Sequence, residues 1–229
     1  MITPNTIFWI IFIGVTIAST LVQSKLQSKM KKYSTMPLLN GLTGHQVAAQ
    51  MLRDHGINNV TVGSVAGQLT DHFNPANMTV NLSEIVDGRC SIASAAVAAH
   101  ECGHAVQHAT GYAPLRLRSA LVPAVSFASK LIPWVLLAGM ILIEVFPQLL
   151  LIGIAGFALT ALFSVVTLPV EIDASRRAVA WLDRTGIVPP DQHQYAADAL
   201  KWAAYTYVVA AVSSLATLFY YITVYTSRR

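Results

Sequence analysis

Charged residues are scarce in this chain. Only 11% of its 229 residues are Asp, Glu, Lys or Arg, whereas 54% are hydrophobic. An ordinary soluble domain carries roughly 25% charged residues, and a soluble protein could not cover its surface with so few. The composition therefore predicts a small polar domain combined with a membrane part.

Cysteines and basic stripes are also scarce. The chain has two cysteines and a net charge of only +4, and its Lys and Arg lie in short clusters beside apolar runs. Two cysteines argue against a disulfide framework. Without a basic stripe interleaved with aromatics we expect no nucleic-acid partner, and the charge clusters indicate contact with a lipid bilayer. No cleavable signal peptide is expected, because no charged segment precedes the first apolar run.

Four long apolar runs are present, at Ile7–Val22, Ser119–Ile143, Gln148–Val170 and Ala203–Tyr225. Each is close to the roughly 20 residues that a helix needs to cross a hydrocarbon core. Lysines follow the first run, and arginines flank the second and third. By the positive-inside rule, the N-terminus lies outside and both ends of the central hairpin lie on the cytoplasmic side. Arg228 and Arg229, after the last run, would fall outside, against this rule.

The polar region between the first two runs has its own pattern. Thr43 is a candidate N-cap for a helix that ends before Gly56. Two short strands are expected, with the turn-rich string GQLTDHFNPAN read as a loop between them. A helix of small residues follows, capped by Ser91 or Ser94. The expected elements are a helix at 44–55, strands at 60–65 and 78–82, and a helix at 91–109.

The most specific feature is the string His100-Glu101-Cys102-Gly103-His104, an H-E-x-x-H motif within the last of these helices. Positions four apart share one helix face, so both imidazoles can point at one metal ion. Glu101 then lies where it can take a proton from an attacking water and pass it to a leaving amine. The motif predicts one catalytic Zn²⁺ ion held by His100 and His104, with Glu101 as the catalytic residue.

A catalytic zinc site needs a third protein ligand. His108 lies one further turn along the same helix, but it would be about 12 Å from His100 along the axis, too far for one ion. Glu171 is the better candidate, because it opens a helix-like run just after Pro169. Two apolar runs, an even number, separate it from the motif, so the chain returns to the same side of the membrane.

Three residues near these ligands are not expected to bind the metal. Cys102 is about 200° round the helix from His100 and should face away from the site, in a packing role. Asp173 should point elsewhere on its helix than Glu171, as a supporting carboxylate. Arg177 could pair with an acidic group near the site or contact a lipid headgroup.

Several strings together resemble the YugP-type neutral zinc metallopeptidases of bacteria: LTDHFNP, VAAHECGHAVQHATGY, PLRLRSALVP and LPVEIDASRRAVAWL. The resemblance extends over nearly the whole chain. More distantly, the chain is similar to the HtpX and CAAX prenyl protease type of membrane gluzincins, which carry an E-x-x-A-D motif. Glu171 and Ala174 match that motif, whereas Ser175 replaces the Asp, which leaves open what supports the metal histidines. The resemblance implies a zincin-like catalytic domain that faces the cytoplasm on a membrane anchor.

The loop before the second strand holds a further candidate. His72 could stabilise the oxyanion or contact substrate, or it could be an ordinary loop histidine. Tyr112, His193 and Tyr195 are weaker candidates for the same role. An edge strand typically holds the substrate backbone in metallopeptidases of this architecture, and Met78–Leu82 is the strand we expect to do so.

The expected fold is a mainly α membrane protein, with about four transmembrane helices and a small cytoplasmic α+β zincin-like catalytic domain. Five segments make it up: an N-terminal transmembrane anchor (1–24), a cytoplasmic catalytic segment with the motif helix (25–115), a transmembrane helical hairpin (116–170), a cytoplasmic helix with the third ligand (171–200) and a C-terminal transmembrane helix (201–229).

The expected activity is zinc-dependent endopeptidase cleavage by metal-activated water, at the cytoplasmic face of a bacterial cell membrane. The expected partners are protein or peptide substrates, membrane proteins above all. One alternative is a site-2-type intramembrane protease, which needs the motif helix inside the bilayer. Another is a non-catalytic zinc-binding membrane scaffold, which would have no use for the non-ligand carboxylate of Glu101.

Overall fold

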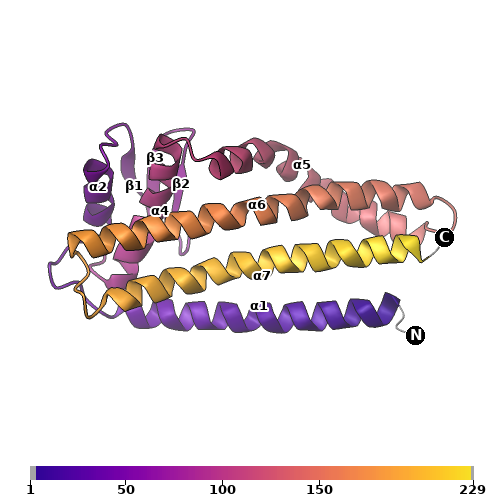
Figure 1. Cartoon of the computed structure of the whole chain (residues 1–229), viewed down its shortest axis with the longest axis horizontal. Helices are drawn as coiled ribbons and strands as arrows, with labels where there is room; N and C mark the ends of the chain where they lie inside the picture. The colour runs from indigo at the N-terminus through magenta and orange to yellow at the C-terminus, as the bar shows by residue number, and fades with distance from the viewer. Residues whose placement is uncertain (1–3, 228–229) are drawn as a thin grey trace. The chain divides into compact units, whose positions relative to one another are not determined.

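The structure is a computed structural model that describes residues 4–227 (Figure 1). Helices dominate this part of the chain, and three short strands form one sheet. The elements in chain order are α1 (Pro4–Ser34), α2 (Gly44–Asp54), β1 (Thr61–Val65), β2 (His72–Asn74), β3 (Thr79–Ser83), α3 (Glu84–Gly88), α4 (Ile92–Ala109), α5 (Ala113–Ile141), α6 (Pro147–Thr185) and α7 (His193–Thr226).

Four helices, α1, α5, α6 and α7, are long and apolar enough to cross a membrane. They contain the four apolar runs of the sequence, apart from the last two residues of the second, so the expected number of candidate spans is confirmed. The helices also extend well beyond the runs. With 39 residues, α6 is about 58 Å long, whereas a hydrocarbon core is about 30 Å thick. Arg228 and Arg229 lie outside the described residues.

The helix expected to begin near Glu171 does not begin there. α6 runs from Pro147 to Thr185 and contains Pro169 in its interior, so reading this proline as a start signal was wrong. An interior proline lacks the N–H of the helical ladder and usually kinks or breaks a helix. Here two side chains from outside α6 reach its backbone at this turn: Gln107 Nε2 donates to Val170 O at 2.8 Å, and the Tyr112 hydroxyl donates to Pro169 O at 3.4 Å.

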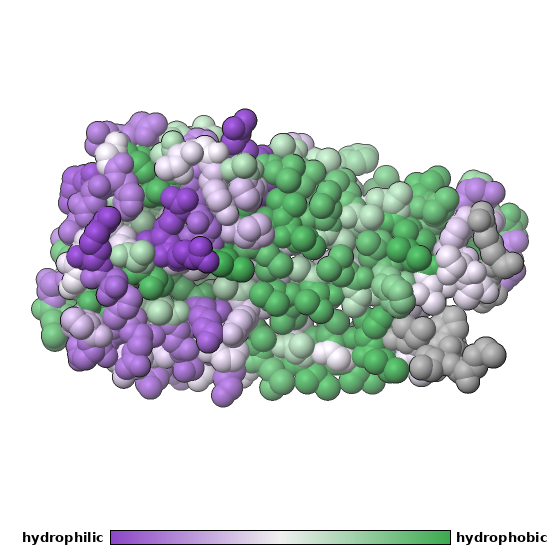
Figure 2. Space-filling view, in the orientation of Figure 1, coloured by the Kyte–Doolittle hydropathy of each residue, from purple (hydrophilic) through white to green (hydrophobic). Residues whose placement is uncertain are grey.

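The described chain forms two compact units. The first, here called the apolar unit, comprises Leu117–Leu168, α1 up to Leu21 and α7 from Thr206. Large apolar side chains cover its surface, which is mostly green in Figure 2; Phe127 and Trp134 are 71% and 70% exposed. Within it α5 and α6 approach closely at Gly139, where an added Cβ would lie 2.6 Å from Leu150 Cα. Small residues at helix contacts and apolar residues outside are typical of membrane-embedded helices.

The second unit, here called the sheet unit, comprises Val22–Arg116 and Pro169–Tyr205. Its surface is mostly purple in Figure 2. Buried residues of α2, the sheet, α4, α6 and α7 form its core, among them Met51, Leu82, Ile92 and Trp181. The unit therefore has a core of its own, as a soluble domain does.

The sheet has the order β1-β3-β2, with β1 parallel and β2 antiparallel to β3. This corrects two expectations. The string GQLTDHFNPAN is not a continuous loop, because β2 lies within it. The strand near Met78–Leu82, observed as Thr79–Ser83, is paired on both sides and cannot be the edge strand. Alternation within three residues is too short a signal to identify β2 in the sequence.

The two helices nearest the motif begin where their caps require. Thr43 accepts a hydrogen bond from Gln46 N, and the Gln46 side chain accepts one from Thr43 N, which completes a capping box. Ser91 accepts from Ser94 N at the start of α4, so the cap is Ser91. The part of α4 before the motif is buried in the core and consists mainly of alanines: Ala95, Ala96, Ala98 and Ala99 are fully buried. These small side chains let neighbouring elements pack close to the motif.

Candidate metal centre

Three potential metal ligands converge in the sheet unit. α4 presents His100 and His104 one turn apart, and α6 presents Glu171. His100 Nε2 lies 3.3 Å and His104 Nε2 lies 3.6 Å from Glu171 Oε2. The ligand atoms of all three residues lie within 4.8 Å of one another. Glu171, which is 67 residues after His104 in the sequence, thus lies beside both histidines of α4.

The donor set and its dimensions fit a zinc ion. Two imidazole nitrogens and one carboxylate oxygen leave a fourth position open, as catalytic zinc sites require. Donor atoms bound tetrahedrally at 2.0–2.2 Å lie about 3.4 Å apart, close to the two observed distances to Glu171. Burial supports this reading, because Glu171 is 2% and His104 is 8% exposed. A bound cation would neutralise the buried carboxylate, which is costly to leave unpaired.

A close contact between two helices brings the ligands together. A Cβ added at Gly103 would lie only 2.6 Å from the carbonyl oxygen of Ala174, so a larger residue at this position would push α4 and α6 apart. Gly103 lies between the two histidines of the motif, and Ala174 is one turn after Glu171. The glycine therefore permits the approach that places a carboxylate of α6 beside the imidazoles of α4.

The distal nitrogens of both histidines have partners. His100 Nδ1 lies 3.1 Å from Ser175 Oγ, and His104 Nδ1 lies 3.1 Å from Gln107 Oε1. With Nε2 facing the shared centre, Nδ1 carries the proton and donates it to these oxygens. Such partners fix the tautomer and the ring orientation of metal-binding histidines. Ser175, which replaces the acidic residue of the E-x-x-A-D motif, thus occupies the supporting position itself.

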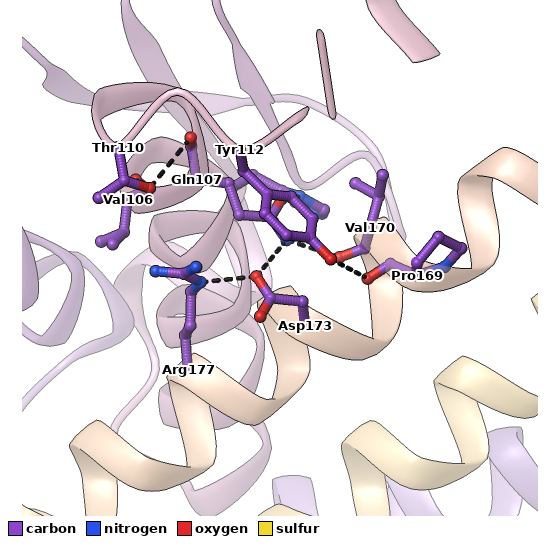
Figure 3. A network of polar contacts seen from close by, with 9 residues as sticks. Val106, Gln107, Thr110, Tyr112, Pro169, Val170, Asp173 and Arg177 are labelled. Atoms are coloured by element: carbon purple, nitrogen blue, oxygen red, sulfur yellow. Dashed lines mark hydrogen bonds and ion pairs between the residues drawn. The ribbon is translucent and has the colours of Figure 1, made fainter. Parts of the chain in front are cut away.

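A polar network extends from Gln107 to the surface (Figure 3). The amide nitrogen of Gln107 donates to Asp173 Oδ2 at 2.9 Å, and Arg177 Nε donates to the same oxygen at 2.6 Å. The Arg177 guanidinium also lies over the Tyr112 ring, 5.7 Å from its centroid. Asp173 therefore supports the site through Gln107, and Arg177 pairs with an acidic side chain. The role of Gln107 was not recognised in the sequence, although it lies one turn from His104.

Glu101 contacts the sheet instead of the three ligands. Phe73 N donates to Glu101 Oε2 at 3.1 Å, and the carboxylate is 8% exposed. The Phe73 N–H points to Glu101 of α4 and therefore away from β3, on the unpaired side of β2. The Glu101 carboxylate is thus hydrogen-bonded to the outward-facing backbone of β2.

Burial and charge act in opposite directions on His104. Burial alone lowers the pKa of this imidazole, but the Glu171 carboxylate and the charge of Glu101 outweigh it, so the pKa lies above its usual value. A cation must displace that proton before it can bind Nε2. Metal affinity should therefore fall as the pH drops through this raised pKa.

The other candidates have their contacts with residues outside the ligand cluster. His72 is exposed; its Nδ1 contacts Thr70 O at 2.7 Å and its Nε2 contacts Asn81 Nδ2 at 3.1 Å. Its proposed oxyanion role stays a prediction that no contact supports. Among the weaker candidates, the Tyr112 hydroxyl contacts Pro169 O, His193 contacts Val179 O, and the Tyr195 ring lies tilted against the Tyr33 ring, with the centroids 5.4 Å apart.

Two further residues of α4 face away from the three ligands. His108 is exposed and its ring lies 5.7 Å from that of Phe73. Cys102 is fully buried and its Sγ contacts Ala48 O of α2. Burial raises the pKa of the Cys102 thiol far above its usual value, so it stays protonated. Both placements agree with the sequence analysis.

Comparisons with known proteins agree with the chemistry of this cluster. The family model described as "Putative neutral zinc metallopeptidase" matches residues 8–226. The "Putative membrane protease YugP" of Bacillus subtilis (strain 168) is 38% identical over 223 residues, which cover 96% of this chain and 98% of that protein. No solved structure matches the chain.

Proposed function

The chain belongs to this family of neutral zinc metallopeptidases, and from that premise we propose that it is a membrane-bound, zinc-dependent endopeptidase. The observation that carries the proposal is the convergence of His100, His104 and Glu171 beside the non-ligand carboxylate of Glu101. Two histidines and one glutamate from a second helix would make it a gluzincin.

Each residue then has a distinct task. His100, His104 and Glu171 would hold the ion, which when bound lowers the pKa of water towards about 7 and polarises the scissile carbonyl. Glu101 takes a proton from the attacking water and delivers it to the leaving amine. Ser175 and Gln107 keep the imidazoles in the correct tautomer. A structural zinc site would not need Glu101, and this residue weighs against a non-catalytic scaffold.

The free edge of β2 is suited to hold the substrate backbone. β2 pairs with β3 along one side only, and Phe73 N–H is directed away from that pairing to Glu101. An extended peptide added at this edge would lie antiparallel or parallel to β2 with its amide groups beside the general base. We therefore assign the substrate-binding edge to β2.

The helix that carries the motif weighs against cleavage inside the bilayer. Within residues 4–227, α4 is not among the helices apolar and long enough to span a membrane, and it packs in the core of the sheet unit. A site-2-type protease would need this helix in the hydrocarbon region. We propose instead cleavage at the cytoplasmic membrane surface, because the basic clusters after the first apolar run and around the central hairpin favour that side. Protein substrates, membrane proteins foremost, would be the partners.

Replacing the general base tests the mechanism. In the full-length protein in detergent, Glu101→Gln keeps the shape of the side chain, so zinc content should stay at the wild-type level. Cleavage of unfolded casein should fall by about 10²–10⁴-fold, the usual contribution of general acid–base catalysis. Glu84→Gln, on the exposed first residue of α3, is the matched control and should cleave normally. Zinc binding with unchanged proteolysis in Glu101→Gln would refute the mechanism.

A further inference from the structure

A mainly apolar cavity of about 250 Å³ lies within the sheet unit, outside the ligand cluster. Pockets for drug-sized ligands usually measure about 300–1,000 Å³, so this one suits a single large side chain. Its apolar lining comes from four parts of the unit: Leu26 and Met30 of α1, Leu69 of the β1–β2 loop, Ile85 and Val86 of α3, and Ala93 and Val97 of α4.

Two segments, α4 and the chain that enters β2, connect the lining of this cavity with the general base Glu101. On α4, Val97 lies four residues before Glu101 and three before His100, so these side chains share one helix face within about 6 Å along the axis. On the other side, Asp71 lines the cavity, and two residues later Phe73 N donates to Glu101. The cavity lining therefore lies about one helical turn from the proposed reaction centre on α4, and two residues from Phe73 on the chain that enters β2.

The cavity surface is mainly apolar, although polar side chains, among them Lys31 and Gln68, also line it. The Asp71 carboxylate is already engaged, because Oδ1 accepts from Ser83 N at 2.7 Å and from Ser83 Oγ at 3.0 Å. Apolar side chains provide most of the remaining cavity surface. Recognition would thus rest on the burial of apolar surface and on shape, which select one side chain over another by size.

Resting on the proposed endopeptidase function, we propose that this cavity is the substrate subsite that receives a large apolar side chain next to the scissile bond. An extended peptide advances about 3.3 Å per residue, so the occupant lies within about two residues of the cleaved bond. The α1 wall makes the anchor helix a determinant of specificity. Its cavity-lining residues Gln23, Leu26, Gln27, Met30, Lys31 and Ser34 recur at three- and four-residue intervals, along one face of the helix.

The test compares cleavage-site profiles of the full-length protein in detergent, with unfolded casein as substrate and mass spectrometry as the readout. Wild-type sites should share a large apolar residue at one fixed position. Met30→Trp fills the cavity, so kcat/KM for such sites should fall at least about tenfold, while sites with Ala, Gly or Ser at that position change little. Ser28→Trp places the same side chain on an exposed position of α1 outside the lining and should keep the wild-type profile.

A second variant covers the case in which Met30→Trp does not fold. Met30→Ala enlarges the cavity and should shift the preference towards Phe over Leu. Identical profiles in wild type, Met30→Ala and Ser28→Trp would overturn the subsite. So would native mass spectra in which a bound phospholipid is lost from a Met30 variant while its profile is unchanged, since the cavity would then hold lipid. If cleavage in wild type and Glu101→Gln is the same, the proposed function itself fails; if cleavage depends on Glu101 but not on Met30, only the subsite fails.

Discussion

Gly103→Ala tests whether the contact between α4 and α6 assembles the metal centre. The new Cβ would lie 2.6 Å from Ala174 O, whereas ordinary contacts begin near 3.4 Å. The two helices would have to separate by about 0.8 Å to accommodate it. Ala174 is one turn from Glu171, so the carboxylate should move by a similar amount. Metal–ligand distances tolerate only about 0.2 Å, and zinc affinity should therefore fall at least about tenfold.

The steric clash predicts that Gly103→Ala destabilises the protein, whereas helix propensity predicts that it stabilises it. The measured stability therefore discriminates between these two effects. Alanine is favoured over glycine in a helix interior by about 0.8–1.0 kcal/mol. Overpacking in a close contact costs about 1–3 kcal/mol. We expect the steric term to prevail, because the obstructing atom belongs to the backbone of α6 and cannot rotate away. The metal-free variant should be less stable than the wild type.

The assay is a zinc titration against a competing chelator, combined with thermal unfolding of the metal-free protein in detergent. Gly88→Ala is the control, since a Cβ at Gly88 would meet no atom within 4 Å; it should keep wild-type zinc affinity. A Gly103→Ala protein that binds zinc as wild type does, and unfolds at a higher temperature, would refute the proposed role of this contact.

Three other predictions concern single side chains. Glu171→Ala should lose tight zinc binding and the stabilisation that zinc provides, about 2.7 kcal/mol at a hundredfold excess over Kd, whereas the exposed Glu84→Ala should lose neither; full zinc occupancy in Glu171→Ala would exclude it as a ligand. Gln107→Leu removes the partner of the second motif histidine and should weaken zinc binding by about 10–100-fold, as measured by chelator competition; unchanged affinity would show that the ring is oriented by other contacts. In the folded protein a maleimide should label the half-buried Cys90 faster than Cys102, because burial excludes the reagent and raises the pKa of the Cys102 thiol; equal labelling rates would contradict the packing of α4 against α2.

Local patterns in the sequence predicted much of the architecture. The four apolar runs lie in α1, α5, α6 and α7, because an apolar span is a feature of contiguous residues. The Thr43 and Ser91 caps were identifiable since capping joins residues within one turn. Errors occurred where neighbours outside the segment decide. Pro169 resembled a helix start signal in the sequence. In the structure, the side chains of Gln107 and Tyr112 contact the α6 backbone at this proline, and the helix continues through it.

Strand roles required the tertiary structure. Nothing within residues 79–83 reveals that β3 pairs on both sides, and only the sheet order leaves β2 at the edge beside α4. The cavity is likewise a product of distant segments, since α1 forms one wall and α4 another.

The sequence by itself determined that His100 and His104 share a helix face with Glu101 between them, because the period of an α-helix depends only on spacing. It also indicated Glu171 by the even number of apolar runs before it. The tertiary structure decided that this carboxylate lies 3.3 Å from His100, and that Ser175 and Gln107 support the two imidazoles. These contacts depend on how closely α4 and α6 pack, which is set by the glycine at position 103 and not by any local period.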